Sequence, residues 1–239
     1  MCGKPSDVGP FSDDEYTLPP LENIPIVVDV DVVTERRKGE LFRDPGISAT
    51  AIHTERRLTV GERVEKIAQL VAAEPNESWV LWTETDYEGD EIERAIPGAG
   101  NLRGGMSVDA RERLLEDFSN GKLRVLIAKP KIAGFGLNWQ HCARMAFVAA
   151  TYSFEAYYQA VRRMWRFGQE RPVKCYLVSG ATESHVVSVL QEKIGKFEEM
   201  RSMMLQVDST SGGNATSKSL KYTGEKPFEV PNWLTGEIK

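Results

Sequence analysis

Residues 153–169 read SFEAYYQAVRRMWRFGQ, and they carry the most specific pattern in this 239-residue chain. At 3.6 residues per turn, the stretch predicts a short amphipathic helix with one face in the core. Ser153 can cap its amino end, and Gly168 is placed to end it. The core stripe falls at positions i, i+4, i+7 and i+8, which are Tyr157, Val161, Met164 and Trp165.

The opposite face of this predicted helix carries Gln159 and three arginines, Arg162, Arg163 and Arg166. No acidic residue of the predicted helix lies three or four positions from Arg163 or Arg166, whereas an ordinary solvated face interleaves Glu with Arg. Closely spaced guanidinium groups repel one another, so the pattern favours an external polyanion, phosphate above all. A merely solvated basic face is the alternative.

The same stretch contains the pattern Gln-Ala-x-x-Arg-x-x-Arg-x-Gly-Gln, from Gln159 to Gln169. This pattern resembles motif VI of superfamily 2 helicases, and most closely that of the Swi/Snf-type DNA translocases. The resemblance implies that Arg163 and Arg166 are catalytic arginine fingers directed at the ATP γ-phosphate, with Gln159 also at the nucleotide. Such fingers stabilise the charge that develops during phosphoryl transfer.

A glycine-containing segment, KPKIAGFGLN at residues 129–138, follows a predicted buried strand. Gly134 and Gly136 allow the backbone to approach a ligand closely, although a plain turn would also contain them. The segment resembles motif V of the same family, which joins the nucleotide site to the DNA groove. The resemblance implies ATP contacts for both glycines and Asn138. Family members usually carry Thr where Pro130 stands, so this chain lacks the hydroxyl contact that the Thr would provide.

Basic residues around these motifs are candidates for contact with DNA phosphate, with a solvated role as the alternative. They are Lys129, Lys131, Arg103 and Arg111.

Three further segments fit the family: residues 80–82 are placed like motif IV, residues 105–118 have the spacing of its Gly-Ser/Thr-x-x-x-Arg segment, and residues 180–186 resemble the start of its last helix. The resemblance covers about residues 75–200.

Short apolar strands alternate with amphipathic helices, which predicts a three-layer α/β domain with a mainly parallel sheet. The resemblance implies a RecA-like lobe. Ligands of such sheets gather at the carboxyl ends of the strands. The expected strands are residues 26–33, 79–83, 124–128, 144–149 and 173–178, with a brief one before Gly104; the expected helices follow Thr59 and Ser107 and cover residues 86–96, 153–169 and 182–204. Thr59 and Glu62 have the spacing of a capping box.

Three regions are expected from composition. Residues 1–23 are acidic and Pro-rich and predict an extended linker, residues 24–206 form the lobe, and residues 207–239 predict a flexible tail. The sequence shows no leader, no membrane segment and no cysteine spacing typical of disulfides or metals, which favours an intracellular protein. The net charge is −5, yet residues 122–174 hold ten Lys/Arg against two acids. That +8 block is the footprint expected of a DNA-binding surface.

The sequence lacks Gly-x-x-x-x-Gly-Lys-Ser/Thr, the usual device for holding the phosphates with Mg²⁺. In the resembling family that device belongs to a first lobe. We therefore expect the second lobe of an ATP-dependent DNA helicase or translocase, inactive alone, with ATP and Mg²⁺ as cofactors. The Mg²⁺ would be held mainly by a Walker-bearing first lobe supplied in trans or upstream. The alternative is a non-enzymatic DNA-binding or regulatory module; a small-molecule enzyme lacks any base, nucleophile or cofactor fingerprint.

Overall fold

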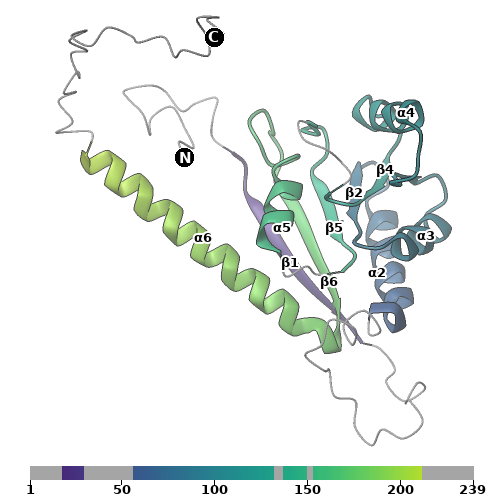
Figure 1. Cartoon of the computed structure of the whole chain (residues 1–239), viewed down its shortest axis with the longest axis horizontal. Coiled ribbons are helices and arrows are strands. Elements are labelled where there is room, and N and C mark those ends of the chain that lie inside the picture. The colour runs from purple at the N-terminus through teal and green to yellow at the C-terminus, as the bar shows by residue number, and fades with distance from the viewer. Residues whose placement is uncertain (1–17, 30–55, 132–136, 150–152, 212–239) are drawn as a thin grey trace, which may run out of the picture.

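The computed structural model of the chain describes residues 18–29, 56–131, 137–149 and 153–211 (Figure 1). Six strands form one sheet in the order β1-β6-β5-β2-β4-β3, and every neighbouring pair is parallel. The strands are β1 (Leu21–Val28), β2 (Trp79–Trp82), β3 (Gly100–Asn101), β4 (Val125–Ala128), β5 (Arg144–Phe147) and β6 (Val173–Gly180). The predicted α/β fold with a mainly parallel sheet is confirmed.

Helices cover both faces of this sheet, and alternate strand residues pack against different helices. Trp79 and Leu81 of β2 belong to a buried cluster with α2 and α3, while Val80 and Trp82 belong to one with α4, α5 and α6. Successive side chains of a strand point to opposite faces, so the molecule has three layers. The helices are α2 (Val60–Ala73), α3 (Asp86–Ala95), α4 (Val108–Ser119), α5 (Phe154–Val161) and α6 (Ser184–Ser211), with the 3₁₀ turn η2 (Ala181–Glu183) before α6.

The first strand differs from its prediction. β1 begins at Leu21 rather than at Ile26, so the last three residues of the stretch expected to be a linker lie in the sheet. Pairing with β6, from Leu21 opposite Val173 to Val28 opposite Gly180, sets these bounds. The alternating valines after residue 28 suggested a later strand, but residues 30–33 lie outside the described part. Long-range pairing of this kind has no signal in local periodicity.

The last helix also extends further than expected. α6 continues to Ser211, past both the predicted helix end at Met204 and the expected lobe boundary at residue 206 (Figure 1). None of the helices in the described part of the chain is long and apolar enough to cross a membrane.

A buried ion pair joins α2 to α3 at the carboxyl edge of the sheet. The Arg63 Nη1 atom lies 3.2 Å from Glu88 Oε1, and both side chains are 0% exposed. The second carboxylate oxygen of Glu88 accepts hydrogen bonds from the backbone N–H groups of Glu84 (3.0 Å) and Thr85 (3.2 Å). With the Thr85 side chain, these contacts form a capping box that begins α3 directly after β2.

Arg63 also reaches two further segments, the residues just before α2 and the end of β5. Its Nη2 donates to Arg56 O at 2.6 Å, its Nε donates to Thr59 Oγ1 at 3.1 Å, and its Nη1 also donates to Val148 O, just after β5. Thr59 is the N-cap residue of α2, as predicted, but its hydroxyl makes no capping hydrogen bond and accepts from Arg63 instead. The Arg63–Glu88 pair thus ties the starts of α2 and α3 to the ends of β2 and β5.

We expect Arg63→Met to lower the free energy of unfolding by about 3–5 kcal/mol, because the substitution leaves the buried Glu88 carboxylate without its cation. Urea denaturation of the full chain measures this. The matched control is Arg94→Met, which breaks the exposed Arg94–Glu91 pair on α3 and should cost less than about 1 kcal/mol. Equal losses for the two variants would contradict the role given to the buried pair.

Candidate functional site

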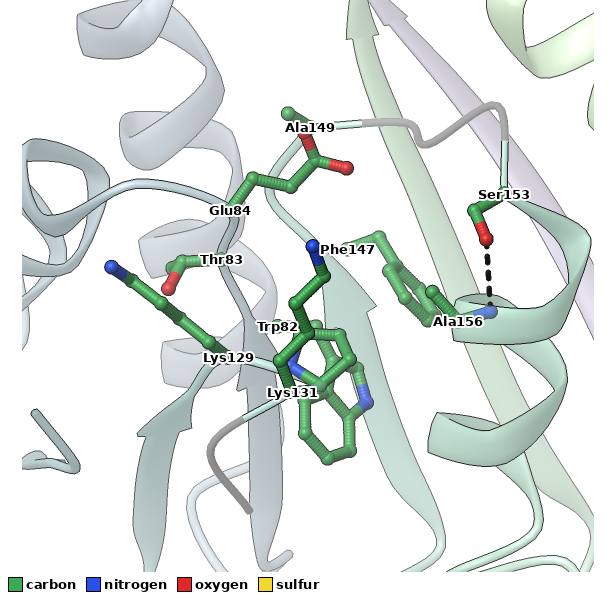
Figure 2. Close-up of a pocket in the computed structure, with 10 residues that line it drawn as sticks. Trp82, Thr83, Glu84, Lys129, Lys131, Phe147, Ala149, Ser153 and Ala156 are labelled. Carbon is green, nitrogen blue, oxygen red and sulfur yellow. Dashed lines mark hydrogen bonds between the residues drawn. The ribbon is translucent and has the colours of Figure 1, made fainter. Parts of the chain in front are cut away.

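A cavity of about 290 Å³ opens at the carboxyl ends of β2, β4 and β5 (Figure 2). The rings of Trp82 and Phe147, the last residues of β2 and β5, contribute apolar wall, and Ser153 and Ala156 contribute the amino end of α5. Its lining also includes Thr83, Glu84, Lys129, Pro130, Lys131 and Ala149. The cavity lies where ligands of parallel α/β sheets are expected.

A second hollow, of about 560 Å³, shares Lys129 with the first and is also lined by Asp86, Arg103 and the loop of residues 104–106. The Lys129 Nζ atom lies 2.7 Å from Asp86 Oδ1, and this hydrogen bond and charge lower the pKa of the Asp86 carboxyl. Asp86 is the first residue of α3, so its position follows from the capping box behind it. Lys129 therefore lines both hollows.

The other predicted DNA-contacting residues gather at the same edge. Arg103 Nη2 lies 2.7 Å from both Asp90 Oδ1 and Glu93 Oε2 on α3. Arg111 Nη2 donates to Gly104 O at 3.3 Å and so supports the loop that lines the second hollow. The structure brings these four basic residues together, and acidic side chains of α3 hold two of them in place.

The predicted arginine helix is shorter than its pattern suggested. α5 ends at Val161, so Arg163 and Arg166 lie beyond it. Arg163 N donates to Ala160 O (3.3 Å) and Met164 N donates to Val161 O (3.1 Å). Both hydrogen bonds join residues three apart, as in a 3₁₀-helix. This tighter winding changes the angle per residue. The expectation that Gln159, Arg163 and Arg166 line one solvent-facing helix face is therefore wrong.

The helix ends before Gly168, so the prediction that this glycine ends it is wrong, whereas the predicted cap and the core positions Tyr157, Val161 and Met164 are confirmed. Ser153 Oγ accepts the capping hydrogen bond from Ala156 N at 3.2 Å. Tyr157, Val161 and Met164 are buried. Trp165 is half-buried, and its Nε1 donates to Pro19 O at 2.7 Å.

Arg163 is held inside the lobe and is only 8% exposed. Its guanidinium carbon lies 5.9 Å from the ring centroids of both Trp82 and Trp139, within cation–π range. Nη2 lies 3.5 Å from Pro130 O, at the start of the segment that resembles motif V. Burial lowers the pKa of the Arg163 guanidinium from its ordinary value. Neither tryptophan could be predicted as a partner of Arg163, because nothing in local periodicity shows which rings an arginine will contact.

The other described candidates for the nucleotide site are more exposed than Arg163. Gln159 is exposed, and its Nε2 donates to Glu155 Oε1 at 3.0 Å. Arg166 is half-buried and Asn138 is exposed. Gly134 and Gly136 lie outside the described residues.

The closing residues of the pattern have a structural explanation. Gln169 is 4% exposed, and its Nε2 donates to Cys142 O (3.0 Å) and Met164 O (3.3 Å). Gly168 has a φ of 87°, and a Cβ there would lie 2.7 Å from the Gln140 amide. The glycine therefore permits both the left-handed turn and a close side-chain approach.

The kinds of side chain present indicate whether this part of the chain could hold a metal ion. Among the described residues, no group of three His, Cys, Asp or Glu side chains could hold a metal ion. The side chains that the motifs supply here are mainly Arg, Lys and Gln, which suit phosphate oxygens rather than Mg²⁺. The described part of the chain thus fits the phosphates of a nucleotide or nucleic acid better than it fits a cation.

The fold is an α/β lobe with a parallel six-stranded sheet, and basic side chains gather at its carboxyl edge. Residues 62–168 match the family described as helicase conserved C-terminal domain. This part of the chain is similar to that family, and the resemblance to superfamily 2 helicases of the Swi/Snf type is confirmed.

Two curated relatives illustrate the likeness. The chain is 33% identical over 108 residues to the uncharacterized ATP-dependent helicase YqhH of Bacillus subtilis, covering 44% of this chain and 18% of that protein. It is 31% identical over 138 residues to the DNA repair protein rad8 of Schizosaccharomyces pombe, covering 54% and 12%. The match thus spans less than a fifth of either relative. Among solved structures, the C-terminal part of the Fun30 ATPase domain aligns with a TM-score of 0.49 and 18% identity, covering 54% of this chain and 45% of that one.

We expect Gly168→Ala to destabilise the chain by about 1–2 kcal/mol, because a Cβ at positive φ is strained and displaces the Gln140 amide. The control is Gly61→Ala in α2, where nothing lies within 4 Å of the added Cβ. That change should be neutral or stabilise by up to about 1 kcal/mol. Thermal unfolding measures both, and a neutral Gly168→Ala would contradict the account of this turn.

Proposed function

We propose that the chain is the second lobe of an ATP-dependent DNA helicase or translocase. The observation that carries the proposal is the clustering of four predicted DNA-contacting residues, Lys129, Lys131, Arg103 and Arg111, at the carboxyl edge of a lobe with a helicase C-terminal domain. The lobe is proposed to run from β1 through the body of α6. The relatives' names, ATP-dependent helicase and DNA repair protein, support the assignment.

The DNA-facing role belongs to the two hollows. Lys131 is exposed beside the first, and Arg103 and Lys129 flank the second. Cations spaced along one edge can follow a phosphate backbone without reading sequence. Asp86 and Glu93 hold Lys129 and Arg103 in fixed positions, but they also compete with phosphate for those cations.

The ATP-facing role belongs to the turn after α5. Arg166 is proposed to reach the γ-phosphate when the two lobes close, since its side chain is less buried than that of Arg163. Gln159, Asn138 and the backbone around Gly134 and Gly136 are proposed to complete the nucleotide contacts of this lobe. Mg²⁺ is proposed to be held by the Walker-bearing first lobe. There it would neutralise phosphate charge, while this chain would supply guanidinium groups.

The DNA-facing role predicts weak, sequence-independent binding that falls steeply with salt, because each phosphate contact releases counterions. Lys131→Ala should weaken binding and reduce the salt slope by about 1. Asp86→Asn should strengthen binding, since it removes the carboxylate that competes for Lys129. Fluorescence anisotropy with a duplex at several salt concentrations measures these effects.

The control for this series is Lys196→Ala, because Lys196 lies on α6 in an exposed pair with Glu192, away from the hollows. Its affinity and slope should match those of the unsubstituted chain. Binding that does not depend on salt, or an equal effect of Lys196→Ala and Lys131→Ala, would count against the proposed surface.

The ATP-facing role predicts that Arg166→Ala lowers kcat of the two-lobe enzyme by about 10³- to 10⁵-fold while DNA affinity stays nearly unchanged. Steady-state ATPase assays with saturating DNA measure the change. Arg162→Ala is the control, because the Arg162 guanidinium carbon lies 5.5 Å from the centroid of the Trp165 ring. This substitution should lower kcat much less. If Arg166→Ala lost DNA affinity in step with turnover, Arg166 would be a DNA contact instead.

A further inference from the structure

Two tryptophans from separate segments pack against each other, and one arginine in the interior of the lobe lies against both rings. Trp82 ends β2, and Trp139 follows the segment of residues 129–138 that resembles motif V. Their ring centroids are 6.1 Å apart, and the Arg163 guanidinium carbon is 5.9 Å from each. A planar guanidinium is well suited to contact two aromatic faces, and the contact strengthens away from water.

Other aromatic side chains fix the two tryptophan rings in turn. Phe118 of α4 packs edge-on against Trp139 with centroids 5.4 Å apart, and Phe147 of β5 lies 6.3 Å from Trp82. Both tryptophans are almost fully buried. The rings therefore have little freedom to move away from the arginine.

Backbone contacts connect the same parts. Trp139 N donates to Arg163 O at 3.0 Å, so this tryptophan holds both the main chain and the side chain of Arg163. Arg163 Nη2 reaches Pro130 O, at the other end of the motif V segment. Three residues further on, Arg166 N donates to Met164 O at 3.1 Å within the same tight turn. A shift of Arg163 would move this turn, and Arg166 with it.

We infer that Trp82 and Trp139 are positioning residues that clamp Arg163 and thereby fix the turn presenting Arg166. The inference rests on the proposed ATP-dependent function. Arg163 then acts as the connection between the DNA-facing segment that begins at Lys129 and the ATP-facing Arg166, rather than as a second finger. Neither tryptophan touches the reacting atoms.

The clamp itself can be tested on the full chain without any activity. In a ¹⁵N-arginine-labelled sample, the Arg163 Nε–H signal, assigned by its loss in Arg163→Lys, should lie upfield of the signals of exposed arginines. Ring currents of the two tryptophans cause this displacement. Trp139→Leu should abolish most of the displacement, whereas Trp139→Phe, which retains a ring, should keep part of it and guards against simple misfolding.

The matched control is Trp165→Leu, because Trp165 contacts Arg162 and not Arg163. This variant should move the Arg162 signal and leave that of Arg163 in place. An Arg163 signal among those of the exposed arginines, or one unchanged by Trp139→Leu, would overturn the clamp.

The positioning role is tested by kinetics of the two-lobe enzyme. Trp139→Leu should lower kcat by about 10- to 100-fold with the KM for ATP and the DNA affinity nearly unchanged, because a displacement of about 1 Å can cost 10²-fold. Trp139→Phe should recover part of the loss.

If Trp139→Leu abolished the displacement of the Arg163 signal but left kcat unchanged, the positioning role would be overturned. Absence of turnover in the unsubstituted enzyme would overturn the proposed function and the positioning role with it, while the spectroscopic result on the clamp would stand.

Discussion

The arrangement of this lobe depends on the buried ion pair between Arg63 and Glu88. Removing two charges from water is costly, and the cost is offset only where every remaining donor and acceptor is satisfied. Here Glu88 caps α3 and holds the turn after β2, while Arg63 reaches the end of β5 and the start of α2. The pair therefore holds together the segments that follow β2 and β5 at the carboxyl edge of the sheet. Glu84, which lines the cavity, and Asp86, which holds Lys129, stand on the turn that Glu88 secures.

The exposed and the buried cations at this edge of the sheet differ in their partners. At the surface, Lys129 and Arg103 meet carboxylates that are exposed, so their pairs are weak and phosphate can replace them. In the interior, Arg163 contacts aromatic rings and a carbonyl, and desolvation lowers its pKa without removing its charge at neutral pH. The surface cations are thus available to a ligand, while the buried cation is proposed to position the turn that carries Arg166.

Much of this lobe could be predicted from sequence. The buried strands at 79–82, 125–128 and 144–147 and the helices α3 and α4 lie within a few residues of their predicted positions, because short apolar runs and capping residues are local signals. Local signals do not report long-range contacts. Pairing of β1 with β6 moved the first strand, and contacts with Trp82 and Trp139 drew Arg163 inward where helical periodicity placed it outward. The roles of the candidate site residues stay predictions.

The most direct test of the account is DNA-dependent ATP turnover, measured for this chain alone, for a Walker-bearing first lobe alone and for the two mixed. In the proposed function this chain contributes guanidinium groups, and a Walker-bearing first lobe would hold the nucleotide phosphates with Mg²⁺. We predict turnover in the mixture only, rising in proportion to the scarcer lobe. Turnover by the homogeneous chain alone, at the rate of the mixture, would contradict the account.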